Sequence, residues 1–221
     1  MGRWEPNARG RLERAAAELY VERGFERTTV AEISRRAGLT ERTFFRHFTD
    51  KREVLFAGSV TLEEQCAGAV AAAPDGASPM DATAAALSTA ARLLDESGEH
   101  VRQRRTVIDA NAELRERELV KLASLSLALA EALRRRDVDD PTAELTAEIA
   151  VAVLKVAVGR WTNGPVERPM GELLDDCLDV LRALLAGRGA GQPRGPVRRR
   201  VAWRVPSRSR ARALGPPGSA W

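Results

Sequence analysis

One short segment of the chain gathers side chains that can donate hydrogen bonds. Residues 41–48 read Glu-Arg-Thr-Phe-Phe-Arg-His-Phe. Phe44 and Phe48 lie four residues apart and would share the inner face of a helix. The polar side chains beside them would then face solvent: Arg42, Thr43, Arg46 and His47. Guanidinium, hydroxyl and imidazole groups on an exposed helix can contact the base edges and phosphates of duplex DNA.

Start and stop signals place these donors on the second helix of a pair. Thr29, with Glu32 three residues later, predicts a capping box for the first helix. Gly38 can adopt the left-handed conformation that ends a helix, and Thr40 is then the N-cap of the second. Two short helices joined by a tight turn predict a helix-turn-helix over about 29–48, whose second helix enters the major groove.

Further helices must cover the apolar side of this pair. Residues 7–23 repeat apolar positions at helical spacing, with Asn7 as a cap. Asp50 and Glu53 form another capping pattern, which predicts that the next helix runs from residue 51 to about residue 73. We therefore expect a compact three-helix head within residues 1–60.

These features together resemble the TetR (tetracycline-repressor) family of bacterial transcription regulators. The resemblance rests on matching residues between Leu12 and Leu55, namely Ala-Ala-x-x-Leu, Gly24-Phe25, Thr28-Thr29-Val30, Ala37-Gly38-Leu39-Thr40, Thr43-Phe44-Phe45-Arg46-His47-Phe48 and Lys51. It implies DNA contacts by Thr28, Thr29, Thr40, Arg42, Thr43, Phe45, Arg46, His47 and Lys51. The family often has tyrosine at the position of Phe45, and phenylalanine cannot donate that phosphate hydrogen bond.

Charge divides the chain into three parts. Residues 1–60 carry 12 Lys and Arg against 9 Asp and Glu, residues 61–186 carry 14 against 22, and residues 187–221 carry 9 Arg and no acid. Phosphates would repel the acidic middle part, so DNA contact is expected in the first part or in the last. We expect a helix-turn-helix domain over 1–60, a ligand-binding and dimerisation domain over 61–186, and an Arg/Pro/Gly-rich disordered tail over 187–221.

The expected fold class is all-α. Aromatic residues make up 5% of the chain, alanine is abundant, and alternating strand patterns are almost lacking. Beyond the helix that ends near residue 73, the apolar periodicity predicts helices over 80–96, 99–109, about 114–136, 142–161 and 173–185.

The last two of these helices carry more apolar surface than one small domain can cover. Pairing with their copies across a two-fold axis would bury it, and in the TetR family the last two helices form a four-helix dimer interface. The expected interface residues are Ile149, Val153, Val156, Trp161, Leu174, Leu178 and Leu181. A monomeric core is the alternative interpretation.

The resemblance also implies that the helices between residues 51 and 136 enclose a pocket for a small, mostly apolar effector. Its candidate lining residues are Leu62, Leu87, Leu94, Ile108, Leu122 and Leu125, although ordinary core is the commoner role for residues of this kind. His100, Arg104 and Arg105 could meet an anionic ligand, although solvated residues on a helix surface are the default interpretation.

Other classes of protein find little support. The chain has two histidines and lacks a nucleophile elbow, metal-ligand spacing or a phosphate loop, so no enzyme, metal or cofactor is expected. Cys66 and Cys177 read as reduced core thiols, with a redox switch as the alternative. The apolar run 149–158 is too short to cross a bilayer, and no secretion signal is apparent, so we expect a cytoplasmic protein without a membrane partner.

The sequence thus predicts a homodimeric, sequence-specific regulator of transcription. It would be a repressor that a small ligand releases from a near-palindromic double-stranded DNA operator. Two alternatives stay open: an activator, or a weakly specific architectural DNA-binding protein that relies on its arginine tail. The salt dependence of binding to random DNA would distinguish the second alternative.

Overall fold

The computed structural model describes residues 7–164 and 168–187 of the chain. Within these residues every regular element is a helix, which confirms the expected all-α class. The elements are α1 (Ala8–Arg23), α2 (Val30–Arg36), α3 (Glu41–His47), the 3₁₀ helix η1 (Glu53–Phe56), α4 (Ser59–Ala71), α5 (Pro79–Glu96), α6 (Gly98–Ala110), α7 (Ala112–Arg134), α8 (Asp140–Asn163) and α9 (Met170–Leu185). Apart from Gly187, the predicted tail lies outside the described residues.

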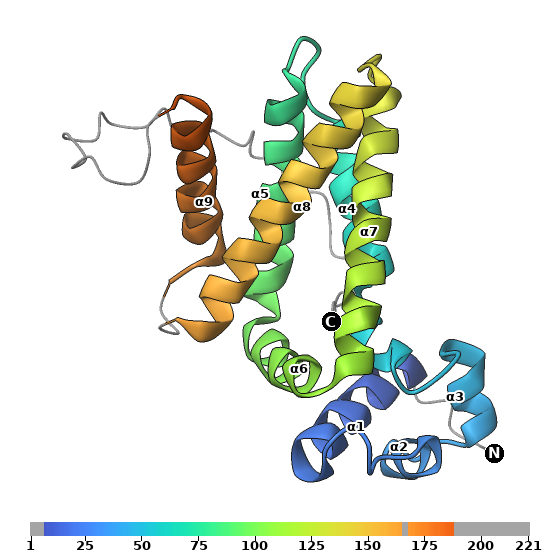
Figure 1. The fold of residues 1–221 in the computed structure, drawn as a ribbon. Coiled ribbons are helices and arrows are strands. Elements are labelled where there is room, and N and C mark those ends of the chain that lie inside the picture. Colours follow the sequence, from blue (N-terminus) through green and yellow to red (C-terminus); the bar gives the residue numbers. More distant parts are fainter. Residues whose placement is uncertain (1–6, 165–167, 188–221) are drawn as a thin grey trace, which may run out of the picture.

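The head contains α1, α2, α3 and η1 and lies at one end of the molecule (Figure 1). Its core is built around the fully buried side chains of Phe25, Phe44 and Phe56. Arg36 ties α2 to α1, because its guanidinium donates to the carboxylates of Glu18 and Glu22 at 2.8–3.2 Å. The three helices therefore hold one another in a fixed arrangement.

The prediction of a single helix from residue 51 to about residue 73 is wrong, because two separate elements occupy this range. Asp50 does cap the start, since its Oδ1 accepts from the backbone N–H groups of Arg52 at 2.7 Å and Glu53 at 3.2 Å. The turn that follows is 3₁₀, and α4 begins only at Ser59. The interruption has a tertiary cause, because the Ala57 carbonyl accepts from the guanidinium of Arg9 in α1 and Leu55 to Ala57 are buried in the core of the head.

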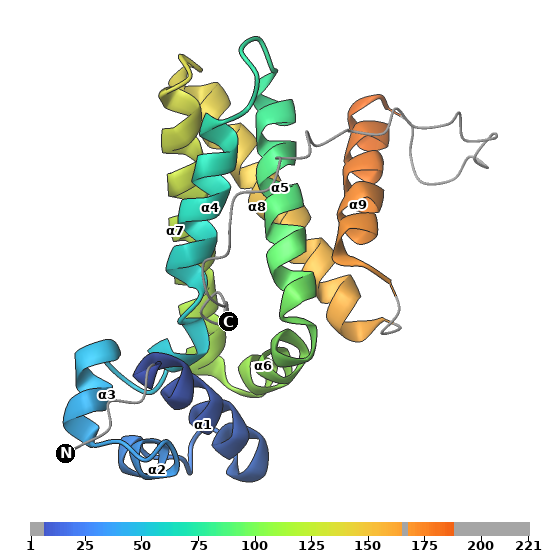
Figure 2. The same cartoon turned by 180° about the vertical axis from the view of Figure 1, so that it is seen from behind.

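The body contains α4 to α9 around a second apolar core. Helix α4 lies between α5 and α7 on the face seen in Figure 2, and α8 crosses behind them. Helix α9 stands at the side of the body and packs against α5 and α8. Ser97 occupies the position between α5 and α6, and Gly98 begins α6.

Head and body meet along α6 and the first turn of α7. Helix α6 packs against α1, and Val107, Ile108 and Leu114 belong to the core of the head. A movement of α6 relative to the body would therefore carry the head with it. None of the described helices is long and apolar enough to cross a membrane.

Candidate DNA-binding surface and effector pocket

Helix α3 is positioned by the two local signals that begin it. Gly38 has φ +64°, a left-handed backbone conformation that glycine adopts without the steric penalty of a Cβ, so the turn favours glycine. Thr40 then caps α3, with its Oγ1 accepting from the backbone N–H of Thr43 at 3.1 Å. The capping box of Thr29 and Glu32 at the start of α2 is also confirmed. The turn and both caps thus have the geometry of a helix-turn-helix.

The outward face of α3 carries charged, polar and apolar groups side by side. Arg42, Phe45 and Arg46 are exposed and Thr43 is half-buried, whereas Phe44 and Phe48 are buried. Phe45 is 56% exposed, so this face of α3 also presents a large apolar side chain to solvent. The two arginines form no ion pair with any residue that the structure describes. This face can therefore donate to DNA and also contact a thymine methyl group.

Two side chains expected to contact DNA, those of Thr28 and Lys51, form hydrogen bonds inside the head. Thr28 is 1% exposed, and its hydroxyl donates to the Gly24 carbonyl at 2.9 Å. The Lys51 ammonium donates to the carbonyls of Phe25 at 2.9 Å, Thr28 at 3.2 Å and Glu26 at 3.4 Å. Because an ammonium has three N–H groups, these bonds use its whole donor capacity. Both side chains brace the loop between α1 and α2.

His47 lies at the end of α3, half-buried beside cationic groups. Its Nε2 is buried and has no hydrogen-bond partner among the described residues. Desolvation lowers the pKa of the imidazole, and the charges of Arg46 and Arg9 lower it further. The ring is therefore mainly neutral at pH 7 in the free protein, and a nearby phosphate would raise the pKa of the imidazole by favouring its charged form.

The body holds a small cavity of about 80 Å³ between α4, α5, α6, α7 and α8. Four of the predicted lining residues meet there: Leu62, Leu94, Leu122 and Leu125. The structure places the other two elsewhere. Leu87 is buried in the body core away from the cavity lining, and Ile108 packs in the head core.

The polar end of this body cavity connects to the head through η1. The ammonium of Lys121 lines the cavity and lies 3.0 Å from Oε2 of Glu53 in η1, which also accepts from Arg117. Burial raises the pKa of the Glu53 carboxyl, but the bonds from Arg117 and Lys121 outweigh it and leave the pKa lowered. An ionised Glu53 thus fastens the head to α7. The sequence shows only an acidic residue after a cap here, and no local pattern indicates its partners 64 and 68 residues away.

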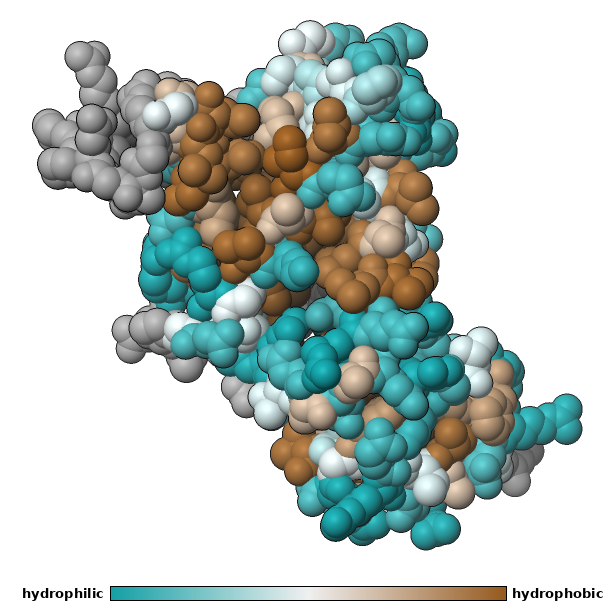
Figure 3. Space-filling model, viewed as in Figure 1, coloured by the Kyte–Doolittle hydropathy of each residue, from teal (hydrophilic) through white to brown (hydrophobic). Residues whose placement is uncertain are grey.

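The expected dimer-interface residues fall into three groups by burial. Val153, Trp161, Leu174 and Leu178 are buried in the chain's own core, and Ile149 and Leu181 are partly buried against it. Val156 is 55% exposed. Other large apolar side chains on α8 and α9 are also exposed, namely Leu145, Val180, Leu184 and Leu185. Figure 3 shows apolar surface gathered over these two helices and reaching α7.

Comparison with known sequence families accounts for both parts of the chain. Residues 13–57 match the family described as bacterial regulatory proteins, tetR family, and residues 77–186 match the MftR C-terminal domain. The HTH-type transcriptional regulator TcmR of Streptomyces glaucescens is 37% identical over 78 residues, which are 35% of this chain and 34% of TcmR. The match thus spans about a third of that regulator's length. TcmR is a regulator rather than an enzyme, in agreement with the class expected from the sequence.

Solved structures share the fold at low sequence identity. SmeT, the repressor of the Stenotrophomonas maltophilia multidrug efflux pump SmeDEF, has been solved with triclosan; that structure superposes with a TM-score of 0.57 at 23% identity, covering 80% of this chain and 91% of SmeT. FadR of Bacillus subtilis, solved with stearoyl-CoA, superposes with a TM-score of 0.56 at 18% identity, covering 77% of this chain and 96% of FadR. At these identities the likeness establishes a common architecture of head and body.

Proposed function

The chain belongs to the TetR family of bacterial regulatory proteins, and from this we propose that it is a homodimeric, ligand-responsive repressor of transcription. It would act in the cytoplasm, where its operator DNA is found. The observation that carries the proposal is the outward face of α3. There Arg42, Phe45 and Arg46 are exposed on a helix that a glycine turn and two buried phenylalanines hold in place.

Different residues of this surface would read bases and bind phosphates. Arg42 and Thr43 lie in the first turn of α3, the part of a recognition helix that contacts base edges. Phe45 supplies an apolar contact for a thymine methyl group. Thr29, Thr40, Arg46 and His47 lie around these residues and would contact the backbone, which fixes the register of the protein on the duplex.

Two heads in one dimer would read two half-sites. The exposed apolar side chains of α8 and α9 are too many and too close together for a surface that stays in water. A self-complementary contact between two copies buries this patch on both chains at once. The operator would then be a double-stranded DNA sequence that is near-palindromic, because its symmetry follows that of the dimer.

A ligand in the body cavity would reach the head through Lys121. Leucine side chains line the cavity together with charged side chains of both signs, which suits a mostly apolar molecule with one polar group. The charged lining residues are Glu63, Arg104, Arg105, Glu118, Lys121 and Lys155. The cavity of about 80 Å³ is small, so binding requires helices α4 to α8 to move apart. A ligand that draws Lys121 away from Glu53 loosens η1, and the dimer then favours head positions that no longer fit the operator.

Comparison of specific with nonspecific affinity tests this proposal. A sequence-specific repressor should bind its selected duplex at least about 10³-fold more tightly than random duplex at physiological salt. We expect that ratio from fluorescence anisotropy titrations with the full chain. An architectural protein that relies on nonspecific charge would bind both DNAs within a few-fold and show the same steep salt dependence on each, and that result would overturn the proposal.

A further inference from the structure

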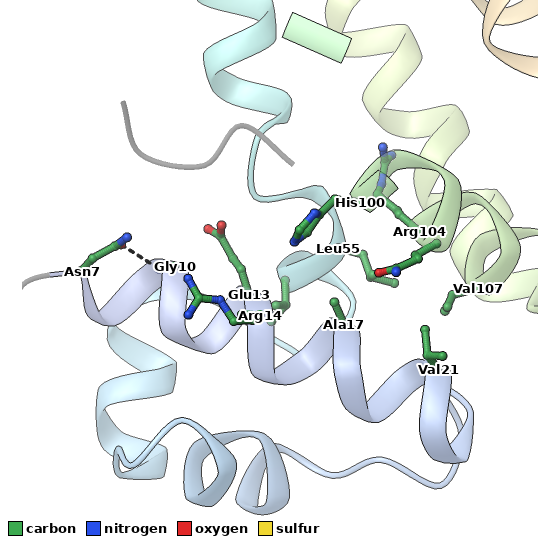
Figure 4. Close-up of a pocket in the computed structure, with 12 residues that line it drawn as sticks. Asn7, Gly10, Glu13, Arg14, Ala17, Val21, Leu55, His100, Arg104 and Val107 are labelled. Carbon is green, nitrogen blue, oxygen red and sulfur yellow. Dashed lines mark hydrogen bonds between the residues drawn. The ribbon is translucent and has the colours of Figure 1, made fainter. Parts of the chain in front are cut away.

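A second cavity, larger than the body cavity, lies at the junction of head and body. It has a volume of about 280 Å³, against about 80 Å³ for the body cavity. Its walls come from α1 and η1 of the head and from α6 of the body, as Figure 4 shows. A volume of this size approaches the lower limit of ordinary small-molecule sites, and no helix needs to move to create it.

The floor of this junction cavity is apolar. Val54 and Leu55 of η1 and Val107 of α6 are buried there, and Ala17 of α1 is half-buried beside them. A compact hydrocarbon or aromatic group placed on this floor would exclude water from aliphatic side chains on both sides. Apolar contact with this floor therefore contributes to the affinity for a ligand, but it does not select the charge of that ligand.

The rim of the junction cavity carries an excess of positive charge. On α1, the Glu13 carboxylate is already paired with Arg9 at 3.0 Å, and Arg14 forms no ion pair with any described residue. On α6, His100 lines the cavity without a side-chain partner in the same residues, and Figure 4 shows Glu13 and His100 directed toward the space between the helices. The guanidinium of Arg104 stacks over the Phe56 ring, with its Cζ 5.0 Å from the ring centroid. Its Nη2 lies 3.9 Å from Oε1 of Glu118.

We infer that the junction cavity is a second ligand site, separate from the body cavity, which takes a small organic anion such as a carboxylate on a compact apolar body. The carboxylate lies between Arg14 of the head and His100 of the body, and the apolar part rests on Val54, Leu55 and Val107. Arg14 can give a bidentate pair and the imidazole a third hydrogen bond.

Such a ligand would connect the two parts of the molecule. It contacts α1 on one side and α6 on the other, so any motion that separates these helices breaks its contacts. Binding therefore favours the head position of this structure over others, in proportion to the difference in affinity between them. The site adds a control on the head that does not pass through Lys121 and Glu53.

The test uses the untagged full chain with benzoate as the probe and benzamide as its neutral match. The chain has two histidines, His47 and His100, so the imidazole NMR spectrum has one set of signals for each, and His100→Gln assigns them. We expect a saturable shift of the His100 signal with benzoate, an unchanged His47 signal, and binding to benzamide at least about tenfold weaker.

Variants locate the site and separate it from the body cavity. Arg14→Gln should weaken benzoate binding by about tenfold or more, while Arg92→Gln on α5 and Lys155→Gln at the body cavity should leave it unchanged. The inference is overturned if the His100 signal does not saturate, if benzamide shifts it equally, or if Arg14→Gln binds as the wild type does. No DNA is used, so failure here is distinct from failure of the proposed repressor function.

Discussion

Arg42 is the side chain whose role in reading sequence is easiest to isolate. It is exposed on the first turn of α3 and has no ion pair among the described residues, so its removal costs the folded head little. If Arg42 forms a bidentate contact with a guanine, Arg42→Ala should cost about 1–3 kcal/mol on the selected duplex. Anisotropy titrations measure this cost, and Arg92→Ala on α5 is the control. Equal losses on random and selected DNA would show that Arg42 contacts the backbone only.

Lys51 presents the opposite case, a cation whose donors are already used. Its three hydrogen bonds hold the loop between α1 and α2, so Lys51→Ala should lower the free energy of unfolding by about 1–3 kcal/mol. Chemical denaturation measures this, with Arg46→Ala, exposed on α3, as the control that leaves stability unchanged. A stable Lys51→Ala protein with a salt slope reduced by about one would show that Lys51 binds a phosphate instead.

For single residues, the sequence predicted the helix caps well but predicted the hydrogen-bond partners of other side chains poorly. Thr29, Gly38 and Thr40 act through neighbours within three or four residues, which a local pattern can reveal. The burial of Thr28 and the three carbonyls around Lys51 depend on how α1 and its loop pack in space. The family resemblance supplied positions for these residues, but it carried no information about which donors the fold had already used.

Among the elements, η1 decides how the head is joined to the body. Glu53→Gln removes the charge that Arg117 and Lys121 share, and should lower the free energy of unfolding by about 1–3 kcal/mol at pH 7. Because the pKa of Glu53 is lowered in the folded state, this contribution is present above the unfolded pKa of about 4.3 and is lost as pH falls through the lower folded value. Denaturation of wild type and variant at pH 7 and pH 3 checks this. A difference in stability that persists at pH 3 would contradict it.

We predict that two copies of the chain associate through the outer faces of α8 and α9. Val156 is 55% exposed, so Val156→Glu should leave the chain folded while it breaks a contact between copies. Val60 on α4 is 54% exposed and gives a matched control, Val60→Glu. We expect a wild-type dimer at micromolar concentration and at least tenfold weaker association of Val156→Glu in sedimentation experiments. A stable wild-type monomer would contradict the account.

Helix positions were predicted well wherever the apolar period was strong, as for α5, α8 and α9. The interruption between η1 and α4 was missed, because it depends on Arg9 taking the Ala57 carbonyl, a contact between residues 48 positions apart. The apolar faces of α8 and α9 indicated an interface but not which residues lie outside. Val153 shows this, because it has the same periodicity as its neighbours but is buried within the chain.

At the scale of the whole molecule, the head core, the body core and the contact between them along α6 determine which parts can move. We call this contact the seam. The head core includes Val107 and Ile108 of α6, so the seam between head and body is continuous rather than a loose linker. The junction cavity lies between head and body, the body cavity lies within the body, and Arg104 lines both of them. Ligands at the two places would therefore influence one head position, which no pattern in the sequence indicates.

Selection of bound sequences from random duplex DNA at physiological salt tests the central claim most directly. A dimer that presents two copies of α3 should enrich a near-palindromic motif, with half-sites about 34–36 Å apart, one helical turn, or a multiple of it. Such a motif is the predicted result for the full wild-type chain. Enrichment of a single half-site, or no enrichment over the starting pool, would contradict the account of a dimeric, sequence-specific repressor.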